Sequence, residues 1–229
     1  MPFAEISNTG IWVSALMAFK SVRTVCDGES RVRLPTQIGH RLLGAVSSLG
    51  DMQDLPRLEP ITAAEWDEET AEVLGAMGDL NIFHTLAHHP KLLKRWLVFG
   101  NHVLAKSTLP ERERELVILR TGWRCGSEYE FGQHTVIGAR CGLTEAQIRR
   151  LATEELAGWS DDDAVLVTAT DELVEDHTLS DESWQALNER WSTQQVLDLI
   201  FAVGQYTLVS TALRSLGVQL DEGTPGWPT

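Results

Sequence analysis

The stretch "LPERERELVILRTGWRCGSEYEFGQH", residues 109–134, indicates two helices in succession. Its first half begins with a proline, concentrates acidic residues near that start, and continues through the apolar run "LVIL" to Gly122. Its second half opens another helical segment, which ends at Gly142, where a C-terminal glycine is expected. Two adjacent helices are therefore predicted here.

The rest of the chain after Pro60 has the same helical character. Thr62 and Glu65 form a capping-box pattern at the start of one segment, and Pro90 is well placed for the first turn of the next. No alternating strand pattern of useful length interrupts the series, so the predicted fold class is all-α, a helical bundle. The remaining predicted helices cover residues 61–79, 90–107, 144–153, 160–177, 180–191 and 192–217.

Charge and composition exclude several classes of partner. The chain has 33 acidic and 19 basic residues, a net charge of -14, which opposes the basic surface of a nucleic-acid binder. The apolar run "VLDLIFAVGQYTLVSTAL" is interrupted by Asp198 and Gln205, so we expect a buried core helix and no membrane span. The three cysteines form neither an even set nor a short-spaced pair, which favours a reducing, cytoplasmic setting.

The first 51 residues differ from the rest of the chain. They carry five basic and four acidic residues, and their apolar stretch "IWVSALMAF" is too short to span a bilayer and lacks the start of a signal peptide. We predict that residues 1–51 form a poorly ordered N-terminal extension and that residues 53–224 form the domain. An arm that packs on a neighbouring molecule is the alternative.

Ser127, Glu130 and His134 are spaced by three and four residues, so they share one face of their helix. Glu115 lies on the preceding helix, at a position that its apolar run turns at least partly inward. We therefore expect two carboxylates and an imidazole to converge between two adjacent helices. The residues alone favour a stabilising Glu-His pair on an exposed helix face, worth about 0.2 to 0.5 kcal/mol.

Other chemistry at this place is less favoured. A zinc site usually gathers three or four protein ligands, and no second histidine lies at ligand spacing from His134, so no metal is expected. Arg120 and Arg124 either clamp a carboxylate or form ordinary salt bridges. Trp96 and Trp123 either line an aromatic pocket or belong to the core.

The spacing of Glu115, Ser127, Glu130 and His134 resembles that of the carboxymuconolactone decarboxylase and alkylhydroperoxidase D-like family. The resemblance runs from about residue 53 to 224, through "HHPKLLKRWLVFGNHVL", "GARCGLTEAQI" and the closing segment "DLIFAVGQYTLVSTALRSLGVQL". It implies an alkylhydroperoxidase D-like helical bundle that assembles as a homo-oligomer, commonly a trimer or hexamer. It also implies an enzyme that needs no cofactor.

The sequence departs from the peroxidase branch of this family, where a Cys-x-x-Cys pair precedes the histidine. Ser127 and Glu130 occupy those two places. If Cys125 and Cys141 lie on one continuous helix, they are about 24 Å apart at 1.5 Å per residue, too far to form a disulfide. An alkylhydroperoxidase-like antioxidant activity and a non-catalytic oligomeric role are therefore kept as alternatives.

The resemblance favours a decarboxylase-like lyase that acts on a small carboxylated lactone or a related carbonyl compound. In that interpretation His134 is the general acid/base, because the pKa of a histidine is normally about 6.5. Glu130 orients the ring or shares its proton, and Glu115 holds the tautomer. The candidate substrate-binding residues are Ser127, Arg120, Arg124 and Tyr129.

Overall fold

The computed structural model describes residues 55–75 and 78–228, and all regular secondary structure in these two ranges is helical. The all-α prediction is confirmed, whereas the predicted extension over residues 1–51 lies outside the described residues. In chain order the elements are η1 (Ala63–Glu65), α2 (Glu68–Leu74), α3 (Asn81–Leu86), α4 (Pro90–Asn101), η2 (His102–Lys106), α5 (Glu111–Arg124), α6 (Glu128–Arg140), α7 (Glu145–Leu151), α8 (Asp161–Glu175), α9 (Asp181–Arg190) and α10 (Thr193–Leu216).

The helix ends follow the capping chemistry of the sequence. Pro90 is the first residue of α4, as predicted. Ser160, Ser180 and Ser192 precede α8, α9 and α10, and each side chain accepts a hydrogen bond from a backbone N–H of the first turn. α10 ends at Gly217, whose φ of 67° is in the left-handed region that glycine adopts without strain.

The single helix predicted over residues 61–79 is wrong. Thr62 and Glu65 do form a capping box, with the Thr62 backbone N–H donating to the Glu65 carboxylate at 2.8 Å, but it caps only the short turn η1. Asp67 then accepts a hydrogen bond from the backbone N–H of Thr70 at 2.8 Å and starts α2 anew. A second cap a few residues on competes with helix continuation, because the aspartate side chain replaces a helical partner.

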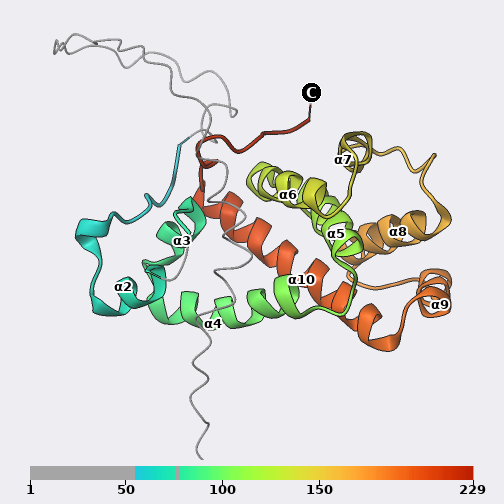
Figure 1. Cartoon of the computed structure of the whole chain (residues 1–229), viewed down its shortest axis with the longest axis horizontal. Coiled ribbons are helices and arrows are strands. Elements are labelled where there is room, and N and C mark those ends of the chain that lie inside the picture. The colour runs from blue at the N-terminus through green and yellow to red at the C-terminus, as the bar shows by residue number, and fades with distance from the viewer. Residues whose placement is uncertain (1–54, 76–77, 229) are drawn as a thin grey trace, which may run out of the picture.

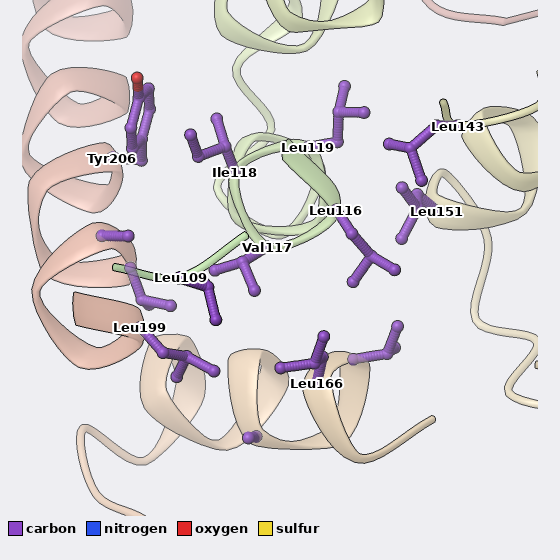
Figure 2. Packing of buried hydrophobic residues seen from close by; sticks show 14 of the residues in the cluster. Leu109, Leu116, Val117, Ile118, Leu119, Leu143, Leu151, Leu166, Leu199 and Tyr206 are labelled. Atoms are coloured by element: carbon purple, nitrogen blue, oxygen red, sulfur yellow. The ribbon is translucent and has the colours of Figure 1, made fainter. Parts of the chain in front are cut away.

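Helix α5 lies at the centre of the larger part of the bundle, with α6, α7, α8 and α10 packed around it (Figure 1). Its residues Leu116, Val117, Ile118 and Leu119 are all fully buried. Figure 2 looks nearly along this helix and shows the four side chains pointing in different directions, toward Tyr206, Leu166 and Leu143 among others. Four consecutive apolar residues point to all sides of a helix, so neighbouring elements must cover this part of α5 on every side.

Helix α10 is long and apolar enough to cross a membrane by length and composition, and half of that window is buried inside the bundle. It contacts α5, α6, α8 and α9, and runs diagonally through the middle of the molecule in Figure 1. Val196, Leu199 and Val203 are at most 2% exposed. It therefore packs as a core helix of the bundle.

Three charged residues of α5 are as buried as its leucines. Arg114, Glu115 and Arg120 are 6%, 0% and 1% exposed. Burial of an unpaired charge is costly, so each of these side chains requires a partner of opposite charge on a neighbouring helix or beside it. These charged residues and their partners form two separate clusters, and one of the clusters lies beside a cavity.

Candidate active site

Helices α5 and α6 approach closely because glycines face the other helix. A Cβ atom at Gly122 would lie 3.5 Å from the Cβ of Glu130, and one at Gly138 would lie 3.6 Å from the Cβ of Glu115. The turn between the helices contains Gly126, with a φ of 63°. The close packing brings a carboxylate of α5 beside the imidazole of α6.

His134 lies between two carboxylates. Its Nδ1 is 2.6 Å from Oε2 of Glu115, and its Nε2 is 3.1 Å from Oε1 of Glu130, four residues earlier on α6. Arg114 donates from Nε and a terminal nitrogen to the other oxygen of Glu115, at 3.2 and 3.1 Å. We call Arg114, Glu115, His134 and Glu130 the His134 cluster; its charges alternate in sign along the chain of contacts.

The electrostatics of the cluster favour the protonated histidine. Burial alone would lower the pKa of His134, but the charges and hydrogen bonds of Glu115 and Glu130 outweigh it and raise the pKa to about 9. His134 is therefore an imidazolium at neutral pH, with both ring N–H groups donating to carboxylates.

Glu130 and His134 lie on the wall of a cavity of about 90 Å³. The ring of Tyr206 packs edge-on against the imidazole, with ring centroids 4.9 Å apart. Burial and the nearby Glu130 raise the pKa of Tyr206 well above its usual value, so it stays a neutral phenol. The other lining residues come from five helical elements and the residue before α3: Leu80, Ile82, Phe83, Trp96, Gly100, Leu104, Tyr129, Gln133, Ile137, Gln205 and Val209.

The C-terminal segment secures one wall of this cavity. Asp221 accepts hydrogen bonds from the Tyr129 hydroxyl at 2.5 Å, from Nε2 of Gln133 at 2.7 Å, and from the backbone N–H of Asn81 at 2.8 Å. Burial raises the pKa of Asp221. One carboxylate thus connects α3, α6 and the chain beyond α10.

The predicted site residues divide into those that meet and those that do not. Glu115, Glu130 and His134 converge as expected, and Tyr129 lies on the cavity wall. Ser127 is the N-cap residue of α6; it is 1% exposed and outside the lining of the cavity.

The two candidate arginine clamps are not brought to this cavity. Arg120 makes two hydrogen bonds of 2.6 Å to Asp171 on α8, and Arg124 makes two of 2.9 Å to the same carboxylate. Both guanidinium groups also flank the ring of Trp123. We call Arg120, Arg124 and Asp171 the Arg120 cluster; its guanidinium groups are occupied by protein partners and do not clamp a ligand in the cavity.

The expectation that Cys125 and Cys141 lie on one continuous helix is wrong. Cys125 is the C-cap residue of α5 and Cys141 that of α6, with the turn at Gly126 and Ser127 between the two helices. Both thiols are free, and burial is the main cause that raises the pKa of each. Their separation is still set by helix length, because α6 has 13 residues and extends about 20 Å.

Sequence reasoning missed two residues that line the cavity, Gln205 and Tyr206, and two that support its wall residues, Arg114 and Asp221. Gln205 had a visible signal, since it interrupts an apolar run, but that signal was interpreted only as evidence against a membrane span. Arg114 adjoins Glu115 in sequence and could have been proposed as its partner. Tyr206 and Asp221 had no local signal, because their contacts arise from α10 and the C-terminal segment crossing other helices.

Comparison with known proteins agrees with this fold. Residues 90–166 match the carboxymuconolactone decarboxylase family. A comparison with curated proteins gave no significant match. An uncharacterized peroxidase-related protein from Ralstonia eutropha JMP134, described as an alkylhydroperoxidase AhpD core, is 16% identical with a TM-score of 0.63, covering 73% of this chain and 93% of its own.

Two other solved structures are similar. A peroxidase-related protein from Silicibacter sp. TM1040 is 15% identical with a TM-score of 0.59, covering 75% of this chain and 92% of its own. The debrominase Bmp8, solved with 2,3,4-tribromopyrrole, is 11% identical with a TM-score of 0.59, covering 78% and 95%. At these identities the likeness concerns the fold. Over residues 90–166 the chain thus resembles the carboxymuconolactone decarboxylase family, and its helical fold is that of the alkylhydroperoxidase D-like structures.

Proposed function

We propose that the protein is an acid–base enzyme that moves a proton at a carbon atom next to the carbonyl group of a small substrate. The observation that carries this proposal is a buried histidine between two carboxylates, 2.6 and 3.1 Å away, on the wall of a cavity. Glu115 orients the ring, and Arg114 in turn fixes Glu115. This is the base-plus-orienter arrangement of many acid–base sites.

The protonation states assign the roles. Because the pKa of His134 is about 9, the imidazolium is the acid at neutral pH and the Glu130 carboxylate is the base on the cavity wall. When Glu130 takes a proton from the substrate carbon, the electron pair of the broken C–H bond moves to the carbonyl oxygen and gives an enolate. The Glu130–His134 pair then returns a proton to a different carbon.

Decarboxylation of a carboxylated lactone, the lyase reaction that the family resemblance implies, would use the same proton. Cleavage of the C–CO₂ bond leaves its electron pair on carbon, delocalised onto the carbonyl oxygen, and the proton of His134 passes to that carbon. His134 becomes neutral and regains a proton from water. The two forms of the reaction differ in whether the substrate carries a negative charge.

Thiol peroxidase chemistry has less support. A peroxidatic cysteine reacts as the thiolate, whereas burial raises the pKa of both Cys125 and Cys141 and keeps them protonated. The two residues lie beyond opposite ends of α6. We therefore do not propose the alkylhydroperoxidase activity.

We further propose a cytoplasmic homo-oligomer. Val98 and Phe99 of α4 and Phe201 and Leu208 of α10 are 70%, 38%, 53% and 58% exposed, and the two phenylalanine rings touch edge to face. An apolar surface of this kind supports burial against a second copy of the chain. Light scattering on the purified protein measures the assembly, and Phe201→Glu should dissociate it.

The test of the acid–base proposal is His134→Gln. Turnover of a lactone or β-keto-acid substrate should fall by about 10² to 10⁴-fold, the usual contribution of a positioned acid/base group. Glu115→Gln should act through the same step, so the double variant should be little slower than His134→Gln alone. Turnover that survives in His134→Gln, measured per folded molecule, would refute the proposal.

A further inference from the structure

The residues that line the cavity include two charged side chains and three residues that each have a buried polar atom without a partner. In the described part of the chain, the charged residues on the wall are Glu130 and His134. Gln133 and Gln205 are 6% and 4% exposed, and the side-chain oxygen of each has no hydrogen-bond partner among the described residues. The same holds for the indole Nε1 of Trp96.

A buried polar atom without a hydrogen bond costs free energy, so these three atoms favour a ligand that completes them. The two amide oxygens are acceptors and require an O–H or N–H donor on the ligand. The indole N–H is a donor and requires an acceptor such as a carbonyl oxygen. All three are uncharged groups, which match an uncharged ligand better than an ionic one.

The charged residues of the cavity wall also favour an uncharged ligand over an anion. Glu130 presents a carboxylate to the cavity, and it would repel an anionic ligand. The positive charge of His134 is already balanced by Glu115 and Glu130. Arg120 and Arg124 are occupied by Asp171.

We infer that the cavity binds an uncharged small molecule that carries both a carbonyl oxygen and a hydroxyl or amide donor, and that it discriminates against carboxylates. A hydroxylactone, a lactam or a hydroxy-enone has this chemistry. The volume of about 90 Å³ suits one small ring, since a single buried water needs about 10 to 15 Å³. The inference rests on the proposed function, because the reacting groups line the same cavity, and it selects the uncharged form of the substrate.

The test compares two probes of equal shape, 5-oxo-2,5-dihydrofuran-2-carboxamide and the corresponding 2-carboxylate. Each is titrated into the full chain at pH 7 by calorimetry. The carboxamide should bind at least about 10-fold tighter, because the carboxylate would be buried without a partner beside Glu130. Equal or tighter binding of the carboxylate, or no binding of the carboxamide, would overturn the inference.

Two variants test whether the probes bind in this cavity. Gln205→Lys adds an ammonium group to the wall and should reverse the preference between the probes. Trp96→Phe keeps an aromatic ring but removes the N–H, so carboxamide binding should weaken by about 5-fold. Trp184→Phe, at a half-exposed position on α9, is the matched control and should leave binding unchanged. A Trp96→Phe variant that binds the carboxamide like the Trp184→Phe control would contradict the inference.

The titrations measure binding without turnover, so the two proposals fail separately. Tighter binding of the carboxylate would contradict the inference that the substrate is uncharged, but it would not affect the proposal that His134 acts as an acid–base group. Full turnover in His134→Gln would remove the acid–base function, whichever probe binds more tightly.

Discussion

Helix α5 carries two buried charge clusters that differ in what surrounds them. In the Arg120 cluster, Arg120 satisfies Asp171 and donates to the backbone oxygens of Leu151 and Thr153, so protein groups occupy the guanidinium on all sides. In the His134 cluster, Glu130 and His134 line a cavity, and the pKa of His134 is about 9. Buried charge therefore does not indicate a functional site by itself; the proposed site rests in addition on a titrating group beside an accessible volume.

The Arg120 cluster should matter for stability and not for chemistry. Asp171→Asn leaves Arg120, 1% exposed, without its counter-charge, and should lower the free energy of unfolding by about 3 to 5 kcal/mol. Urea unfolding monitored by circular dichroism measures this loss. Turnover per folded molecule should stay unchanged, and a loss of activity in the folded fraction would show that the clusters are coupled.

The His134 cluster should make stability depend on alkaline pH. The folded pKa of His134, about 9, is above the unfolded value, so its stabilisation is complete below about pH 6.5 and is lost as pH rises toward 9. The difference between these pKa values corresponds to on the order of 3 kcal/mol. Unfolding curves from pH 6 to 9.5 measure it.

The matched control for this pH dependence is His134→Gln, which should remove the change in stability between pH 6.5 and 9.

The stability contribution of the Arg120 cluster should change at acid pH instead. Although burial opposes it, hydrogen bonds from Arg120 and Arg124 lower the pKa of Asp171, so its contribution is lost as pH falls through the acid range. Identical alkaline profiles for His134→Gln and the wild type would contradict the assigned ionisation of His134.

The smallest effect is expected at the edge of the Arg120 cluster. Glu154 contacts Arg124 at 2.9 Å, but its side chain is 74% exposed. Glu154→Gln should therefore change the free energy of unfolding by no more than about 1 kcal/mol, since water and salt screen an exposed pair. If Glu154→Gln lowered the free energy of unfolding as much as Asp171→Asn, the exposed ion pair would be as important as the buried one, which contradicts this prediction.

The amino-acid sequence by itself determined most of the helices after Pro90 and the Glu130–His134 pair within α6. Prolines and glycines mark helix ends through the conformations that they favour in the chain's own first or last turn, which is why Pro90 and Gly142 could be interpreted directly. Glu130 and His134 are four residues apart on one helix, so their contact is also local. Where two local signals competed, as at Thr62 and Asp67, the pattern alone chose the wrong helix.

Only the tertiary structure decided that Arg120 and Arg124 lie outside the cavity, and how the expected contact between Glu115 and His134 is made. Glu115 meets His134 because glycines let α5 and α6 approach, and Arg120 meets Asp171, which is 51 residues away in sequence. The placement of Gln205 on the cavity wall likewise depends on how α10 crosses the bundle. Such contacts depend on helix packing over the whole domain, and a periodic pattern identifies the buried face of a helix without naming the residue that covers it.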